Sequence, residues 1–269
     1  MSNSNKLGYK IDHELKFYAK YIPMNKNKKT VFISGSSSGI GYHLAKGYKS
    51  MGYNIIINGT NLSKLKKVSL SLGKCDYYLG DITDKKKIEN ITKVIKKKYN
   101  YIDVLICNLG NSDFKKNNTD FEHAFKYNFY STTNLIDSSK KILKKNVSKI
   151  ICISSICSVE HIAGAPIGYS IAKAALNFYI KLISKELAIK NITINGIIPG
   201  NILFKGSLWD LKLKKNRVKT KMYIKNNVPS NIFGSVNDVF DVCKMISESN
   251  SKFITGSLFK IDGGQTRGL

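Results

Sequence analysis

Short runs of β-branched and apolar residues alternate along the chain with longer segments of helical periodicity, and this alternation strongly limits the possible folds. Each short run is apolar at successive positions, as expected for strands that helices cover on both faces. The predicted strands are Val31–Ser34, Asn54–Asn58, Asp76–Leu79, Val104–Asn108, Lys149–Ser154, Ile192–Ile198 and Phe259–Ile261, and the predicted helices cover roughly residues 40–51, 62–72, 84–99, 120–146, 169–190 and 237–248. The pattern predicts an α/β fold with a doubly wound parallel sheet of about seven strands, right-handed crossovers and helices on both faces.

The chain is expected to form one domain. Its 269 residues and 42% hydrophobic content allow a sizeable core, and no Pro/Gly/Ser-rich linker divides it. We expect the domain over residues 30–269, preceded by an extension over residues 1–29 whose order the sequence does not define. The extension lacks the apolar centre of a signal peptide, and no segment has the ~18 apolar residues of a membrane span. Five cysteines without a CxxC pair indicate a reduced, cytoplasmic protein, and four histidines without ligand spacing predict no metal site.

The net charge of +26 raises the question of a polyanionic partner. The chain has 42 lysines but only two arginines, Arg217 and Arg267. Phosphate and base recognition tends to use the planar guanidinium group, whereas these lysines are spread over nearly every segment. We therefore interpret most of the charge as solvated helix surface and expect neither a nucleic-acid nor a membrane partner. A non-catalytic scaffold that binds dinucleotides or nucleic acid stays open as an alternative.

A glycine-rich turn follows the first predicted strand. Residues 34–41 read SGSSSGIG, with glycines at 35, 39 and 41. Glycines at such a place allow a tight turn, close approach of backbone N–H groups to a pyrophosphate, and close packing of the following helix. Because a strand precedes the turn and a helix follows it, the run predicts a dinucleotide site.

The same run also fits G-x-S-x-G, the nucleophile elbow of α/β hydrolases, with Ser37 as the nucleophile. That mechanism requires a histidine late in the chain and an oxyanion loop earlier in the sheet. The last histidine is His161, and the supposed elbow follows the first strand. A serine hydrolase is therefore the weaker alternative.

Several motifs together resemble the short-chain dehydrogenase/reductase family, over residues 28 to 264. The glycine run is similar to the T-G-x-x-x-G-x-G signature of this family, with Ser34 in place of threonine. The resemblance implies a Rossmann-type domain that binds NAD(P). It extends to the acidic residue after the third strand, the N-N-A-G turn after the fourth, and the closing motifs, which here read Gly80-Asp81-Ile82, Cys107-Asn108-Leu109-Gly110, Pro199-Gly200, Ile254-Thr255-Gly256 and Asp262-Gly263-Gly264. The implied cofactor-binding residues are Gly35, Ser37, Ser38, Gly39, Ile40, Gly41, Thr60, Asp81, Ile82, Asn108, Gly110, Tyr169, Lys173, Pro199, Gly200 and Ile202.

The catalytic signature of this family is Tyr-x-x-x-Lys, which places both side chains on one helix face. With 15 tyrosines and 42 lysines, chance alone gives about two such pairs. Two occur, at Tyr42/Lys46 and Tyr169/Lys173. Only Tyr169/Lys173 lies after the fifth strand, fourteen residues beyond Ser155, which is the arrangement of the family.

The resemblance implies a role for each of these residues. Tyr169 is the acid or base, and a phenol with a pKa near 10 needs a neighbouring cation to titrate nearer neutrality. Lys173 is expected to supply that charge and to bind the nicotinamide ribose. Ser155 would stabilise charge on the substrate oxygen, and Asn128 would hold a water in a proton relay. The usual Ser-to-Tyr spacing is thirteen, so Ser154 and Ser158 stay open as alternatives to Ser155.

The cofactor prediction depends on the end of the second strand. Relatives that use NAD carry an acidic residue there, whereas this chain reads Asn58-Gly59-Thr60-Asn61. The missing acid favours NADP(H) over NAD(H), although the arginine that usually grips the additional phosphate is also missing.

Residues 204–229 fall where relatives place a lid over the substrate. This segment carries Trp209 and several basic residues, so an acidic substrate would suit it. The resemblance implies a ketone reductase nearest the 3-oxoacyl-carrier-protein reductase type, acting on a small or carrier-linked carbonyl such as a 3-oxoacyl thioester or a sugar-type ketone.

Relatives pair their 120–146 and 169–190 helices between subunits, so a homodimer or homotetramer is expected. Ala174, Phe178 and Leu182 have the helical spacing for such an interface or for a core.

Overall fold

The computed structural model describes residues 27–111 and 120–268. These residues form one sheet of seven parallel strands in the order β3-β2-β1-β4-β5-β6-β7. The predicted α/β doubly wound fold is therefore confirmed. Residues 1–26 of the predicted extension lie outside the described residues. The strands are β1 (Thr30–Ile33), β2 (Asn54–Gly59), β3 (Asp76–Leu79), β4 (Val104–Cys107), β5 (Lys149–Ile153), β6 (Thr193–Pro199) and β7 (Leu258–Ile261).

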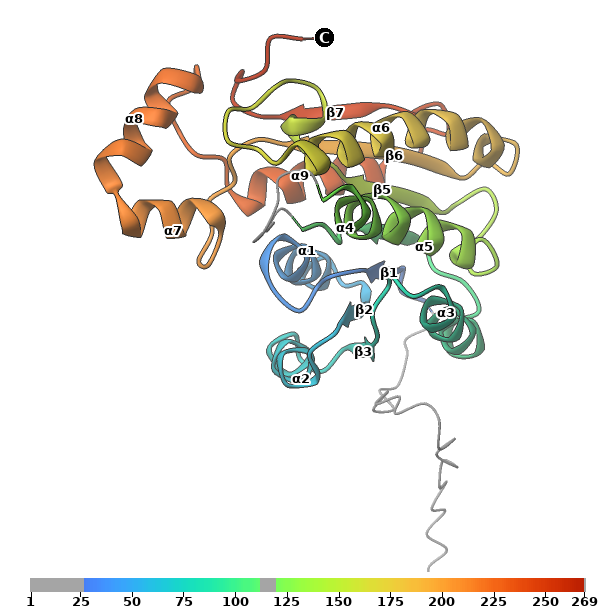
Figure 1. Ribbon diagram of the computed structural model, residues 1–269. Helices are drawn as coiled ribbons and strands as arrows, with labels where there is room; N and C mark the ends of the chain where they lie inside the picture. The colour runs from blue at the N-terminus through green and yellow to red at the C-terminus, as the bar shows by residue number, and fades with distance from the viewer. Residues whose placement is uncertain (1–26, 112–119, 269) are drawn as a thin grey trace, which may run out of the picture.

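Helices cover both faces of the sheet (Figure 1). On one face, α1 (Gly39–Ser50), α2 (Leu62–Ser71) and α9 (Val236–Glu248) bury apolar side chains such as Leu44, Leu65 and Val239. On the other face, α3 (Lys85–Tyr99), α5 (Ser131–Ser139) and α6 (Ile167–Ala188) bury side chains that include Ile91, Leu135 and Leu176. The two cores explain why the central strands are apolar at consecutive positions: each strand contributes alternate side chains to each core.

The predicted helix over residues 120–146 is divided in the structure. It consists of α4 (Phe121–Phe125), a π-helical turn η1 (Lys126–Tyr130) and α5, which ends at Ser139. The apolar period continues through Ile142 and Leu143, but Ile102 pairs with this segment instead, because its N–H donates to the carbonyl oxygen of Ile142 at 2.8 Å. Periodicity alone could not distinguish a helix from a buried turn of the same spacing.

The order of the strands places the functional crevice. From β1 the chain adds β2 and β3 on one side, and then crosses back to place β4 on the other side of β1. The loops that leave the neighbouring strands β1 and β4 therefore run in opposite directions. Ligands of doubly wound sheets bind at such a point, beyond the carboxyl ends of the strands.

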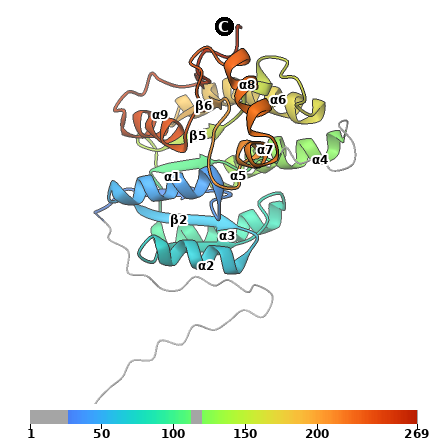
Figure 2. The ribbon, with the colours of Figure 1, turned by 90° about the vertical axis from the view of Figure 1, so that its left-hand side faces the viewer.

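Residues 204–229, which the sequence predicts as a lid, contain two helices that project from the body of the domain (Figures 1 and 2). They are α7 (Leu208–Lys215), which has no buried residue, and α8 (Arg217–Asn227). Trp209 joins them, because its ring lies 5.2 Å from that of Tyr223. Across the described ranges, no helix has the length and apolarity required to cross a membrane.

Candidate active site

The glycine turn after β1 has the backbone that its sequence predicts. Gly35 and Gly39 have φ angles of +58° and +59°, a region that other residues adopt only with strain. A methyl group on Gly41 would lie 2.6 Å from both Asn108 Nδ2 and the Gly35 carbonyl oxygen, so only glycine lets α1 begin this close to β4. Ser34, in place of the threonine of the family, accepts a hydrogen bond from the Asn108 N–H at 3.0 Å and so joins the two loops.

A cavity of about 610 Å³ opens over this turn, and we call it the cofactor cleft. It lies at the carboxyl ends of β1, β2, β3 and β4, at the crevice that the topology predicts. Of the residues predicted to bind the cofactor, those that line the cleft are Gly35, Ser37, Ser38, Gly39, Ile40, Thr60, Asp81, Ile82, Asn108 and Gly110. Gly41 lies behind the turn and allows α1 to pack closely against Gly35 and Asn108. A pyrophosphate fits this cradle, because its wall is glycine backbone and the amino end of a twelve-residue helix.

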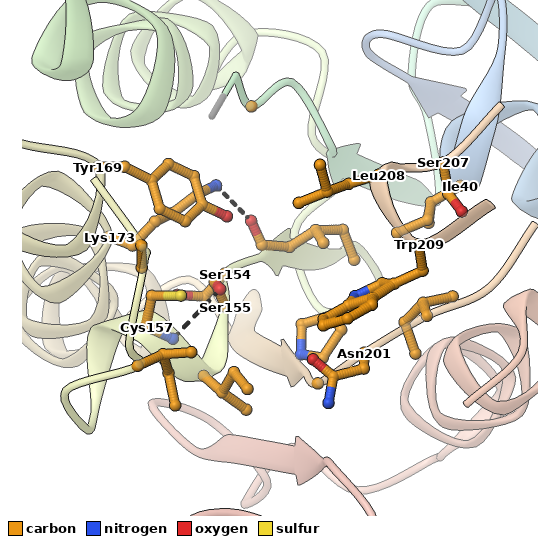
Figure 3. Close-up of a pocket in the computed structure, with 18 of the residues that line it drawn as sticks. Ile40, Ser154, Ser155, Cys157, Tyr169, Lys173, Asn201, Ser207, Leu208 and Trp209 are labelled. Atoms are coloured by element: carbon orange, nitrogen blue, oxygen red, sulfur yellow. Dashed lines mark hydrogen bonds between the residues drawn. The ribbon is translucent and has the colours of Figure 1, made fainter. Parts of the chain in front are cut away.

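A second cavity of about 310 Å³ adjoins the cleft and shares Ile40, Asn108, Gly110 and Phe204 with it. We call it the inner cavity. Its wall includes Ser155, Tyr169, Lys173, Pro199, Gly200 and Ile202 of the predicted residues, together with Leu208 and Trp209 from α7 (Figure 3). The structure therefore brings most of the predicted catalytic and cofactor residues to one continuous site, whereas Asn128 and Gly41 lie behind its wall.

Ser155 and Tyr169 reach the inner cavity from different elements. Ser155 follows β5 and caps a short 3₁₀ turn, accepting a hydrogen bond from the Cys157 N–H at 3.2 Å. Tyr169 lies in the first turn of α6, and its ring points into the cavity beside Ser155 (Figure 3). Burial raises the pKa of Tyr169 to about 12, although a hydrogen bond with Ser155 opposes this shift. The phenol is therefore protonated at neutral pH.

Lys173 lies one turn beyond Tyr169 on α6 and is buried. Its ammonium group donates to the Ile153 carbonyl oxygen at 2.9 Å and lies 6.0 Å from the centre of the Tyr169 ring. Burial lowers the pKa of Lys173 to about 8. The sequence predicts that this cation lowers the pKa of Tyr169, but burial raises that pKa instead.

Gly110 makes room for the lysine. A methyl group at Gly110 would lie 3.1 Å from Lys173 Nζ and 3.3 Å from Asn128 Oδ1. The glycine that the resemblance assigns to the cofactor loop therefore also determines how near Lys173 and Asn128 approach the cleft.

Asn128 is fully buried in the π-helical turn η1. Its Oδ1 accepts from the Asn111 N–H at 2.9 Å, and its Nδ2 donates to the carbonyl oxygens of Asn111 and Ala124 at 2.9 and 3.0 Å. Both amide hydrogens are therefore committed to backbone. The side chain fixes the loop after β4, a contact that the predicted water relay did not include.

The two alternative serines form a separate network. Ser154 Oγ donates to Asn177 Oδ1 at 2.7 Å, and Asn177 Nδ2 donates to Ser158 Oγ, also at 2.7 Å. Of the three serines, Ser155 is the one whose side chain acts on the pKa of Tyr169. Sequence reasoning missed Asn177, although it lies four residues after Lys173 and hence on the same face of α6.

Phe204 and Asn58 were also missed. Phe204 lies in the wall of both cavities, 3.4 Å from where a Cβ on Gly39 would stand. Asn58 Nδ2 donates to the carbonyl oxygens of Tyr78 and Gly80 at 3.1 and 3.0 Å, which ties the ends of β2 and β3 together. For Phe204, an apolar residue in a loop gave no signal in the sequence.

The contacts around Ser37 do not form a hydrolase site. Its hydroxyl lies 2.9 Å from where a Cβ on Gly59 would stand, on the β2 side of the cleft. His43, the histidine next along the chain, hydrogen-bonds the Gly39 carbonyl oxygen at 2.8 Å.

Comparison with known proteins agrees with the geometry. A family model described as enoyl-(acyl carrier protein) reductase matches residues 35–266. The 3-oxoacyl-[acyl-carrier-protein] reductase FabG of Rickettsia prowazekii is 32% identical over 243 residues, which cover 88% of this chain and 96% of that protein. The corresponding FabG of Buchnera aphidicola is 30% identical, covering 90% and 98%.

Solved structures share the fold. YwfH, an NADPH-dependent reductase involved in bacilysin biosynthesis, superposes with a TM-score of 0.81 at 26% identity, covering 90% of this chain and all of that one. The L-sorbose reductase of Gluconobacter frateurii, solved with NADPH and L-sorbose, gives 0.80 at 21% identity, covering 90% and 98%. The family model and the FabG relatives favour an oxidoreductase over the two alternatives that the sequence left open, a serine hydrolase and a non-catalytic scaffold. The chain belongs to the short-chain dehydrogenase/reductase family and is an NAD(P)-dependent oxidoreductase that acts on CH–OH and C=O groups.

Proposed function

We propose that the protein reduces the ketone of a 3-oxoacyl thioester with NADPH. The observation that carries this proposal is the meeting of Ser155 and Tyr169 in the inner cavity, next to buried Lys173 and at the end of the cofactor cleft. The similarity to 3-oxoacyl-[acyl-carrier-protein] reductases over most of both chains supports the substrate class.

In the proposed reaction, a bound nicotinamide supplies the hydride to the carbonyl carbon. Ser155 and Tyr169 donate hydrogen bonds to the carbonyl oxygen, and these bonds strengthen as negative charge develops there. Tyr169 then transfers its proton to that oxygen, so that ketone, hydride and proton give the alcohol. Because its pKa is raised to about 12, Tyr169 carries this proton throughout the physiological range. The Lys173 ammonium stabilises the phenolate until it is reprotonated.

The preference for NADPH is proposed from the end of β2. The chain has Gly59-Thr60 here, and Ser37 and Thr60 line this part of the cleft with hydroxyl groups. The Asn58 amide already bonds the loop after β3. No carboxylate follows β2 directly, so a ribose 2′-phosphate meets no like charge there.

We also propose a homotetramer in the cytoplasm. The side chains of Phe178 and Leu182 on α6 are 66% and 52% exposed, so they do not serve the core. Ala174 lies one turn before Phe178 and is also exposed. An apolar stripe of this kind suits pairing with the same helix of a second copy. The five cysteines are all free, as in a reducing compartment.

The test is a panel of carbonyl compounds with NADPH and NADH, including a 3-oxoacyl thioester, a simple ketone and a ketose. We expect the thioester with NADPH to give the highest kcat/KM. Tyr169→Phe should lower kcat at least about 1,000-fold without changing NADPH affinity, because it removes the proton donor alone. A reduction of the ketose alone would contradict the substrate class, and full activity of Tyr169→Phe would contradict the mechanism.

A further inference from the structure

A third cavity of about 420 Å³ adjoins the inner cavity, and we call it the outer cavity. The two cavities share Ile162, Ala163 and Tyr223 in their linings, so they lie side by side. The outer cavity lies between the loop after β5, the end of α8 and the C-terminal segment that follows β7. A substrate whose carbonyl occupies the inner cavity can therefore extend into the outer one.

The linings of the two cavities differ in chemistry. Around the reacting groups, the inner cavity is lined by apolar side chains such as Ile153, Ile156 and Leu208. The outer cavity is lined by polar and charged groups, among them Lys225, Arg267, Asn227 and Gln265. The inner part thus suits the short acyl end of a substrate, and the outer part suits a polar arm.

Among the described residues, the two cationic side chains of the outer cavity outnumber its one carboxylate, Glu160. Lys225 and Arg267 line it, and over residues 27–111 and 120–268 neither side chain takes part in an ion pair. Glu160, the carboxylate in this wall, accepts a hydrogen bond from the backbone N–H of Arg267 at 2.6 Å. This hydrogen bond holds the C-terminal segment against the loop after β5. It uses the backbone of Arg267 and not the guanidinium group, which can therefore bind a ligand.

Arginine is also the side chain best suited to this role. The chain has 42 lysines and only two arginines, and one of the two lies in this wall. The planar guanidinium group can donate two parallel hydrogen bonds to one phosphate, which a lysine cannot do.

The C-terminal segment is joined to the reaction site. Gln265 Oε1 accepts from Asn201 Nδ2 at 2.6 Å, and Gln265 Nε2 donates to the Tyr223 hydroxyl at 3.3 Å. Asn201 lines the inner cavity, and Tyr223 lines both cavities and stacks on Trp209. A group bound in the outer cavity therefore lies against the same residues that close the inner one.

We infer that the outer cavity binds a phosphate group carried on the part of the substrate remote from the reacting carbonyl, with Arg267 and Lys225 as its ligands. This inference rests on the proposed function, because it states which part of the proposed substrate the outer cavity binds. Two kinds of arm have this chemistry, a phosphopantetheine and a nucleoside phosphate.

Binding can be measured without turnover, because Trp209 is the only tryptophan in the chain and lines the inner cavity. Its fluorescence is followed in the NADP⁺ complex of the full chain during titration with 4′-phosphopantetheine, pantetheine, UMP and uridine. We expect at least one phosphorylated probe to bind about 10- to 100-fold more tightly than its phosphate-free partner, the range of a charge-assisted hydrogen bond.

Three variants separate the site from general charge. Arg267→Gln should remove the difference between the two members of a pair, and Arg267→Lys should keep only part of it. Arg217→Gln, at the other arginine, which is exposed and outside this wall, should leave the difference unchanged. The NADP⁺ affinity of each variant shows whether the domain remains folded.

Equal binding of both members of each pair, no binding of any probe, or equal effects of the two glutamine variants would overturn the inference. A preference for UMP over uridine without one for phosphopantetheine over pantetheine would support the phosphate site and contradict the thioester substrate. If the enzyme does not reduce the thioester but still prefers phosphopantetheine to pantetheine, the proposed function is contradicted and the phosphate site is not.

Discussion

Replacing Lys173 by methionine should inactivate the enzyme and at the same time relieve a cost in stability. The lysine is buried, and burial lowers its pKa from 10.5 to about 8. Below pH 8 the folded protein must keep a charge away from water. The shift corresponds to about 3 kcal/mol at pH 7, since each pKa unit is worth about 1.4 kcal/mol. Methionine fills similar volume without a charge.

The sign of the effect follows from proton binding. Between pH 8 and 10.5 the unfolded chain holds the lysine proton and the folded chain does not, so the lysine's cost diminishes as pH rises. With these two pKa values, the cost falls from about 3 kcal/mol at pH 7 to about 1 kcal/mol at pH 10. Loss of the hydrogen bond to the Ile153 carbonyl oxygen offsets part of the gain at both pH values, by about 1–3 kcal/mol.

The assay is urea denaturation of wild type and Lys173→Met at pH 7 and pH 10 without cofactor. The other titrating groups are common to both proteins, so subtracting the two free energies of unfolding isolates Lys173. We expect the variant to gain about 2–3 kcal/mol relative to wild type on going from pH 10 to pH 7. A difference that does not change with pH would refute the argument that burial of a charge controls this site.

Three further predictions concern the same cleft. The kcat/KM for ketone reduction should fall as pH rises through about 8, to about one tenth of its plateau at pH 9, because the Lys173 cation is lost while Tyr169 stays protonated; a flat profile to pH 9.5 would contradict this. Gly41→Ala should weaken NADPH binding at least about 10-fold in a fluorescence titration, because its methyl group would overlap Asn108 and the Gly35 carbonyl; an unchanged affinity would be inconsistent with the packing. Asn128→Leu should lower the free energy of unfolding by about 1–3 kcal/mol and reduce kcat, because both backbone groups of Asn111 lose their partner; urea denaturation and initial rates will show whether it does so.

Much of the fold could be predicted from the sequence because its signals are local. Central strands such as β1 and β5 are buried at consecutive positions, and the glycine run identifies the turn after β1. The division of the 120–146 segment could not be predicted in this way. It depends on the pairing of Ile102 with the segment around Leu143, a contact between residues far apart in the chain.

The candidate site shows the same contrast. The resemblance to the short-chain dehydrogenase/reductase family predicted that Tyr169, Lys173 and Ser155 would meet, and they line one cavity. The pKa values could not be read from spacing, because they depend on how much water the folded pocket excludes. For Tyr169, burial is the largest cause of the pKa shift, and burial depends on the three-dimensional packing.

Two parts of the molecule with different anchoring meet at the inner cavity. Tyr169 and Lys173 project from α6, a 22-residue helix packed on the sheet, and Ser155 from the end of a buried strand. Leu208 and Trp209 come from α7, which buries no residue at all. The reacting groups are therefore tied to the core, whereas this part of the cavity wall is not. Substitutions in α7 should cost little folding stability, so the shape of the cavity can diverge among descendants of this chain while the groups held by the core are inherited intact.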